Sequence, residues 1–182
     1  MSKTKKDKKQ TSPLAYRSEE DRSYGLAGMT LALATLDAID EVVCINMDAH
    51  GPMVVFSNDF FWGTQVASPK AHWHNLIRNY RITTSLAIAN VLSRCLVREH
   101  GADPTEMLSE LMPVILNEGQ EVCSLEEDEV HTFYENTLMQ TRRTFDNPRL
   151  HPYVDRLADI LTRRRILSGR EIAEELHALH LI

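Results

Sequence analysis

Residues 41–62 read EVVCINMDAHGPMVVFSNDFFW and interrupt the helical periodicity that runs through most of the chain. The stretch holds two apolar runs rich in β-branched residues, Val42–Met47 and Met53–Phe56, on either side of a polar turn at Asp48–Pro52. This arrangement is typical of a β-hairpin. Neither run alternates between apolar and polar residues, so both faces of the hairpin are predicted to be buried. Because an isolated hairpin is only marginally stable in water, helices of the same chain or a second copy must cover it.

The rest of the chain predicts helices around this hairpin. A first helix is expected over Tyr24–Asp40, where apolar residues recur every three or four positions. The longest helix is expected from Pro69 to about His100, with Ser68 as its N-cap and Gly101 as its C-cap. Shorter helices are expected over about 104–117, 125–145, 152–165 and 170–180. The predicted fold is therefore α+β and mainly α: a helix, a buried β-hairpin, a long spine helix, and a bundle of four shorter helices.

Glycines refine two of these boundaries. Gly25 and Gly28 lower the helix propensity near the start of the first helix, so its beginning is expected no earlier than Tyr24. Gly119 and Ser124 are expected to form the turn before the helix over 125–145, with Ser124 as its N-cap.

The length and the charge distribution of the chain limit its number of domains and its possible partners. Its 182 residues fit one globular domain over 23–182, preceded by a flexible basic and polar lead over 1–22. Residues 1–12 hold five lysines and one aspartate, whereas the remainder of the chain is acidic. An acidic body argues against a dedicated nucleic-acid-binding protein. No apolar run reaches the roughly 20 residues of a membrane-spanning helix, so no membrane partner is expected.

The three cysteines, Cys44, Cys95 and Cys123, lie far apart in the sequence, each in or beside an apolar run. An odd number without paired spacing argues against a disulfide framework. It favours a reducing compartment, and a cytoplasmic location is predicted.

The aromatic residues after the hairpin are the strongest functional lead in the sequence. Phe60, Phe61 and Trp62 follow the second strand and are predicted to contact a partner, since aromatic side chains dominate interface energetics. The alternative is that they fold back and cap the core. Trp73 stands at the head of the apolar stripe of the long helix, and it is predicted to be a core residue.

A second hypothesis places a ligand-binding or metal-binding site between the hairpin and the long helix. It would use five polar residues: Asp48, His50, Asp59, His72 and His74. Residues i and i+2 of a helix do not face each other, so His72 and His74 would share a ligand only if the chain were extended there. Convergence of the five residues on one cavity would favour an enzyme or ligand-binding domain.

Two acid–histidine pairs, Asp128 with His131 and Glu174 with His177, have the three-residue spacing that places both side chains on one helical face. Together they resemble half of the dimetal site of four-helix bundles, which also needs two inward-facing glutamates on two other helices. Ordinary surface charge explains the pairs better, and no metal site is assigned. The sequence contains no GxGxxG, Walker, HExxH or CxxC motif, so no cofactor is predicted.

The segment 157–176, LADILTRRRILSGREIAEEL, resembles the closing helix pair of the membrane-bound, ATP-dependent zinc metalloproteases of the AAA family. The resemblance implies a helix–turn–helix that breaks at Ser168-Gly169. The zinc motif and the Walker motifs of that family are absent, so no metal ligand or catalytic role carries over.

These observations favour an intracellular, non-catalytic interaction or regulatory protein over a small enzyme or ligand-binding domain. A homo-oligomer is predicted, because the apolar hairpin leaves an edge strand that pairing across a two-fold axis would satisfy. The alternative is that a different protein binds the same surface.

Overall fold

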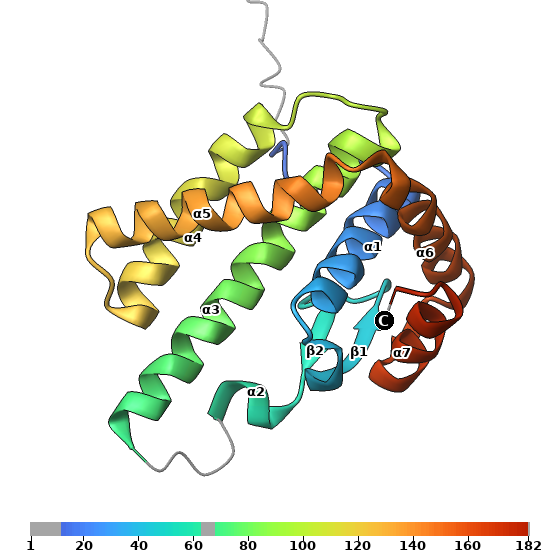
Figure 1. The fold of residues 1–182 in the computed structure, drawn as a ribbon. Coiled ribbons are helices and arrows are strands. Elements are labelled where there is room, and N and C mark those ends of the chain that lie inside the picture. Colours follow the sequence, from blue (N-terminus) through green and yellow to red (C-terminus); the bar gives the residue numbers. More distant parts are fainter. Residues whose placement is uncertain (1–11, 63–67, 182) are drawn as a thin grey trace, which may run out of the picture.

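The computed structural model describes residues 12–62 and 68–181, excluding the side chains of Phe61 and Trp62 (Figure 1). The basic segment 1–11 lies outside the described residues. The elements, in chain order, are α1 (Glu19–Thr35), η1 (Ile39–Glu41), β1 (Val42–Asn46), β2 (Val54–Phe56), α2 (Asn58–Trp62), α3 (Pro69–Leu92), η2 (Ser93–Arg98), α4 (Thr105–Cys123), α5 (Glu127–Phe145), η3 (Pro148–Leu150), α6 (His151–Arg164), β3 (Ile166–Ser168) and α7 (Gly169–Ala178). The predicted mainly helical α+β fold is confirmed.

Helix α1 begins earlier than the sequence predicts. Gly28 does not delay its start, because this glycine lets α1 pack closely against α3. Ser18 caps the helix by accepting a hydrogen bond from the backbone N–H of Asp21, so residues 19–22 form its first turn instead of belonging to a flexible lead. Gly28 lies inside the helix, where a Cβ atom would come within 2.5 Å of the backbone oxygen of Ala89 on α3. The missing side chain lets α1 approach α3 closely. The predicted start at Tyr24 is therefore wrong.

Replacing Gly28 by alanine is expected to lower the free energy of unfolding by about 1–3 kcal/mol through overpacking. The loss should appear although alanine is the better helix former by about 1 kcal/mol. Gly51→Ala is the matched control, since a Cβ there meets no atom within 4 Å. Urea unfolding of both variants measures the difference. A Gly28→Ala variant as stable as Gly51→Ala would show that α1 and α3 are not tightly apposed.

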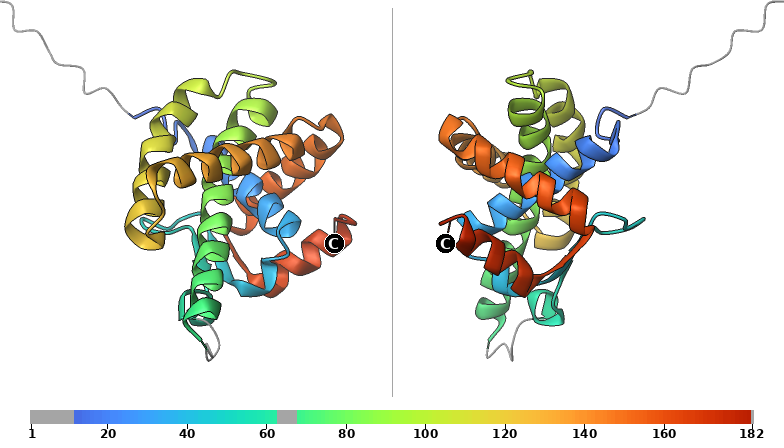
Figure 2. Two further views of the ribbon diagram at one scale, coloured as in Figure 1. Left: turned by 60° about the vertical axis from the view of Figure 1, so that its left-hand side comes forward. Right: turned by 90° about the vertical axis from the view of Figure 1, so that its right-hand side faces the viewer.

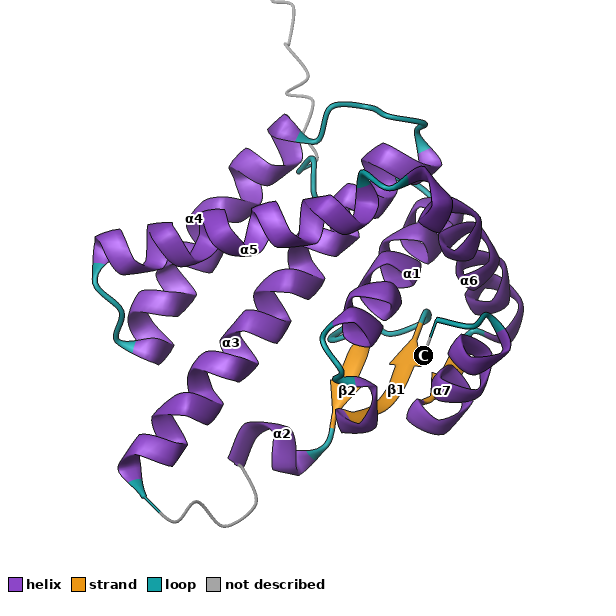
Figure 3. Cartoon of the chain, in the orientation of Figure 1, coloured by secondary structure: helices purple, strands orange, loops and turns teal. Residues whose placement is uncertain are grey.

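The hairpin predicted from residues 41–62 is present and belongs to a three-stranded antiparallel sheet with strand order β2-β1-β3 (Figure 3). In the central row of the sheet, Ile45 stands opposite Val54 on one side and Leu167 on the other, and all three side chains are buried. Strand β3 was not expected from the sequence. It covers the outer edge of β1, so in the described part of the chain only β2 and β3 are edge strands.

Helix α3 is the predicted spine, and its last turns are π-helical. Ser68 caps its start by accepting a hydrogen bond from Ala71 N, and Pro69 is its first residue. The helix continues through the π-helical segment η2 to Arg98. Gly101 then adopts the left-handed conformation expected of a C-terminal glycine, with φ of +92°.

Helix α4 extends beyond its predicted end. Gly119 is not a turn residue: it lies within α4, where a Cβ would stand 2.5 Å from the hydroxyl of Tyr80 on α3. Ser124, in the left-handed region with φ of +51°, ends α4, and Glu126 caps α5 through a capping box with Glu129. The predicted turn at Gly119 and the predicted cap at Ser124 are therefore wrong.

The four helices after the spine form two pairs on different sides of the molecule. Helices α4 and α5 pack on α3, whereas α6 and α7 lie beside α1 and the sheet (Figures 1 and 2). Helix α1 lies between α3 and α6 and is buried on most of its surface. One apolar core therefore runs from the inner face of the sheet through α1 to α3.

Candidate functional site

The aromatic triplet predicted to bind a partner contributes one residue to the core. Phe60 is 2% exposed and stacks on Phe56, with ring centroids 4.0 Å apart. Its backbone oxygen accepts a hydrogen bond from the side-chain amide of Asn79 on α3. Phe60 therefore closes the core between β2 and α3, and its assignment as an exposed anchor is wrong. The side chains of Phe61 and Trp62 lie outside the described residues.

Trp73 shows the opposite error. It is 40% exposed in the first turns of α3, where residues 69–74 are all exposed. Periodicity places Trp73 on the same stripe as the buried Tyr80, but the helix begins beyond the elements that cover this stripe (Figure 1). The prediction that Trp73 is core is therefore wrong.

The five polar residues of the alternative ligand site are all exposed, and none of them lines the cavity between α1, α3 and α5 that is described below. Asp48 and His50 belong to the turn after β1, whereas Asp59 follows β2 at the other end of the sheet. His72 and His74 lie on the exposed start of α3. Asp48 is also engaged, because it pairs with Arg165, and this hydrogen bond lowers the pKa of the Asp48 carboxyl.

The two acid–histidine pairs also stay apart. Asp128 and His131 belong to the start of α5, and Glu174 and His177 belong to α7 on the opposite side of the molecule (Figure 1). Glu174 forms an ion pair with Arg170, one turn earlier on the same helix. Over residues 12–62 and 68–181, no group of three or more His, Cys, Asp or Glu side chains is placed to hold a metal ion.

An apolar surface lies instead on the outer face of the sheet. Ile45, Val54 and Leu167 point inward, so their neighbours along each strand point outward. A β-bulge between Val42 and Cys44 turns Val43 outward as well. We call this surface the outer sheet face; its residues are Val43, Cys44, Asn46, Val55, Ile166 and Ser168. Large apolar side chains from all three strands are exposed there: Val43 by 51%, Val55 by 38% and Ile166 by 51%.

The outer sheet face carries no charged side chain among these six residues. Ion pairs stand at its borders. Arg165, just before β3, pairs with Asp48 and Glu19, and Glu41, just before β1, pairs with Arg78. The turn between β1 and β2 projects from the helical body (Figure 2, right). The outer sheet face is thus an uncharged patch that is apolar apart from Asn46 and Ser168. The paired charges at its borders include Glu171, which accepts a hydrogen bond from the Ser168 hydroxyl and pairs with Arg164.

A buried ion pair holds the N-terminal segment to the helical core. Arg94, at the start of η2, is 2% exposed, and its partner Asp21 on α1 is 1% exposed. The guanidinium donates from Nε to Asp21 Oδ1 at 2.8 Å and from Nη2 to Asp21 Oδ2 at 2.7 Å. Its remaining donors reach the backbone oxygens of Leu14 and Ala15, both at 3.0 Å. Arg94 therefore fixes residues 14–16 against α1 and α3.

The surroundings of this pair determine its protonation. Burial raises the pKa of Asp21, but the hydrogen bonds from Arg94 and from Arg17 N outweigh burial, so the pKa is lowered overall. The Tyr16 ring lies 4.8 Å from the Arg94 guanidinium carbon. Burial also raises the pKa of the Tyr16 hydroxyl. The cluster is therefore a fixed ion pair that stabilises the fold, and four of the five Arg94 N–H donors already have partners in it.

No family model matches this chain, and a search of curated proteins finds no significant match. The resemblance of residues 157–176 to the zinc metalloproteases thus stays confined to that segment. There the structure has two helices, α6 and α7, with strand β3 between them. Over the described residues, no helix combines the length and apolar character needed to cross a membrane.

Neither the outer sheet face as a whole nor Arg94 is among the site residues predicted from the sequence. The hairpin runs do predict two apolar faces, which was the available signal for the outer sheet face. Arg94 gives no such signal, because arginine on a helix is exposed by default.

Proposed function

We propose that this protein is a non-catalytic interaction protein that self-associates by packing its outer sheet face against the same face of a second copy. The observation that carries the proposal is the exposure of Val43, Val55 and Ile166, one from each strand, on one face. Contiguous exposed apolar side chains commonly mark interaction sites. Covering them removes apolar surface from water.

The chemistry of the face favours a second copy over a charged partner. Two identical faces meeting across a two-fold axis bring no like charges together, because none of the six residues is charged. When two sheets pack face to face, such side chains interdigitate and the sheets lie about 10 Å apart. The edge strand β2 offers only three residues for pairing, and short edge strands resist edge-to-edge association. Packing of the faces is thus favoured over extension of the sheet.

The size of the face sets the expected strength of association. Strand lengths of three to five residues give an area on the order of 300 Å². A standard interface buries about 800 Å² on each partner. We therefore expect a reversible dimer with a dissociation constant in the micromolar range. Such a dimer suits a regulatory role that responds to concentration.

The cysteines fit a reducing compartment such as the cytoplasm, which we include in the proposal. All three are free thiols, and Cys95 and Cys123 are buried. Burial raises the pKa of Cys123 to about 11 and also raises the pKa of Cys95. Both thiols therefore stay protonated and unreactive near neutral pH.

Cys44 on the outer sheet face provides a direct test, since it is the partly exposed cysteine. A short bis-maleimide reagent at about 100 µM protein, where a micromolar dimer is well populated, is expected to give a covalent dimer. Cys44→Ser should abolish this product, and Cys123→Ser should leave it unchanged. Absence of the dimer in the wild-type protein, or its persistence in Cys44→Ser, would contradict the proposed surface.

A further inference from the structure

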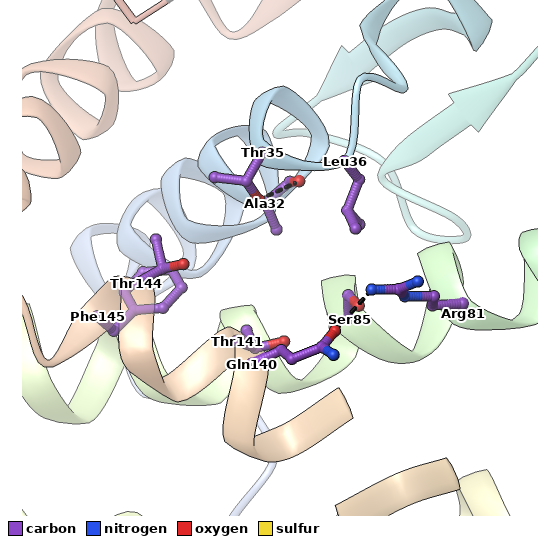
Figure 4. A pocket seen from close by; sticks show the side chains of 9 residues that line it. All are labelled: Ala32, Thr35, Leu36, Arg81, Ser85, Gln140, Thr141, Thr144 and Phe145. Atoms are coloured by element: carbon purple, nitrogen blue, oxygen red, sulfur yellow. Dashed lines mark hydrogen bonds between the residues drawn. The ribbon is translucent and has the colours of Figure 1, made fainter. Parts of the chain in front are cut away.

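A cavity of about 190 Å³ opens between α1, α3 and α5 (Figure 4), and none of the residues of the outer sheet face lines it. Side chains of all three helices surround it. The polar part of its lining includes Arg81 and Ser85 from α3 and Gln140 and Thr144 from α5. The apolar part includes Leu36, just after α1, and Phe145 from α5. For scale, a cavity of about 150 Å³ accommodates benzene.

Ser85 presents a hydroxyl group to this cavity without a partner from the protein. The residue is only 5% exposed, and its hydroxyl forms no hydrogen bond with the part of the chain that the structure describes. Among the described residues, the fully enclosed side-chain polar atoms without a hydrogen-bond partner are Asn79 Oδ1, Thr84 Oγ1 and Arg98 Nε, so the Ser85 hydroxyl keeps accessible surface and can bind a ligand in the cavity. Thr144, on the facing helix, also has an unpaired hydroxyl within the described residues. The cavity therefore offers two unused hydroxyl groups.

Arg81 adds a positive charge that forms no ion pair within the described residues, although the carboxylate residue Asp37 lines an adjoining hollow together with it. Its Nη2 donates to Gln140 Oε1 at 2.6 Å, which is a neutral acceptor. Arg78, one turn earlier, differs because it forms an ion pair with Glu41. The other Arg81 donors are available for an anion at the mouth of the cavity. An arginine guanidinium can donate two parallel hydrogen bonds to one carboxylate.

We propose that this cavity binds a small monocarboxylic acid, with its carboxylate on Arg81 and Ser85 and its short apolar group against Leu36 and Phe145. A single guanidinium matches a single negative charge. A phosphate group carries more charge at neutral pH, and the apolar walls would gain nothing from it. The cavity and the outer sheet face lie on different elements. Ligand binding in the cavity can therefore be tested independently of self-association.

Calorimetric titration with benzoate and with butyrate tests the proposal on the full chain. We expect saturable binding in roughly the millimolar range or tighter, as befits ligands of few atoms. Benzyl alcohol and butanamide, which share the apolar groups but lack the charge, should bind at least about tenfold more weakly, because hydrogen bonds to charged groups are the stronger ones.

Three variants locate the site. Arg81→Gln is expected to weaken benzoate binding by about tenfold or more, and Ser85→Ala by about threefold to tenfold. Arg143→Gln removes an exposed arginine of α5 outside the cavity lining and should leave binding unchanged. Unfolding curves confirm that each variant is folded.

Three results would overturn the proposal. The first is that neither acid shows saturable binding. The second is that the acids and their neutral analogues bind equally tightly. The third is that Arg81→Gln binds benzoate as tightly as the wild-type protein does. Inorganic phosphate binding more tightly than benzoate would overturn the assignment to a carboxylic acid.

Discussion

Replacing Asp21 by alanine is expected to lower the free energy of unfolding by about 3–5 kcal/mol, because it leaves the buried Arg94 guanidinium without its carboxylate. The pair is almost fully enclosed, with side chains 2% and 3% exposed. Arg94 also binds the backbone of Leu14 and Ala15, so the loss should loosen the N-terminal segment as well. Urea unfolding at neutral pH measures the effect.

Asp146→Ala is the matched control for this prediction. Asp146 pairs with Arg142 one turn away on the surface, with side chains 53% and 49% exposed. Exposed pairs of this kind contribute about 0.3–0.5 kcal/mol. Equal losses in the two variants would show that the Asp21–Arg94 pair is solvated in solution.

Acid should weaken the same interaction in the wild-type protein. The pKa of Asp21 is lower in the folded state than its ordinary value of 3.8. Its contribution to stability is therefore present above pH 3.8 and is lost as the pH falls through the lower folded-state pKa. The stability difference between the wild-type protein and Asp21→Ala should shrink across that acidic range. A difference that stays constant down to strong acid would contradict the lowered pKa.

Replacing Phe60 by alanine is expected to cost about 3–5 kcal/mol of stability, since a buried aromatic side chain leaves a cavity. Phe60 is 2% exposed, whereas Trp73, the larger residue, is 40% exposed. Trp73→Ala should therefore cost about 1 kcal/mol or less, as substitutions away from packed features do. Parallel denaturant unfolding of the two variants decides between them. A larger loss for Trp73→Ala would mean that the first turns of α3 are covered in solution.

The hairpin and the spine helix could be predicted from the sequence because each has a strong local signal. β-branched runs flank a polar turn in the hairpin, and Ser68 and Gly101 mark the two ends of the spine. Strand β3 could not be predicted, since three residues show no period. Its pairing with β1 joins residues more than 110 positions apart.

The errors share a physical origin in tertiary packing. Gly28 and Gly119 look like helix breakers locally, but each creates space for a neighbouring helix. Phe60 and Trp73 exchange their predicted environments because burial depends on which elements happen to cover each turn. The cavity lined by Arg81 is formed by residues of α1, α3 and α5, so no single segment of the sequence contains a motif that predicts it.

The most direct test of self-association through the outer sheet face compares Val43→Glu with Val114→Glu by sedimentation velocity over a range of protein concentrations. Val43 lies on the outer sheet face and Val114 on α4, and their exposures are similar, 51% and 60%. The wild-type protein and Val114→Glu should shift toward a dimer as concentration rises, because glutamate on α4 does not touch the proposed interface. Val43→Glu should remain a monomer, because two buried carboxylates would face each other across the two-fold axis. A wild-type protein that stays monomeric at several hundred micromolar, or a Val43→Glu variant that associates like the wild type, would contradict the account.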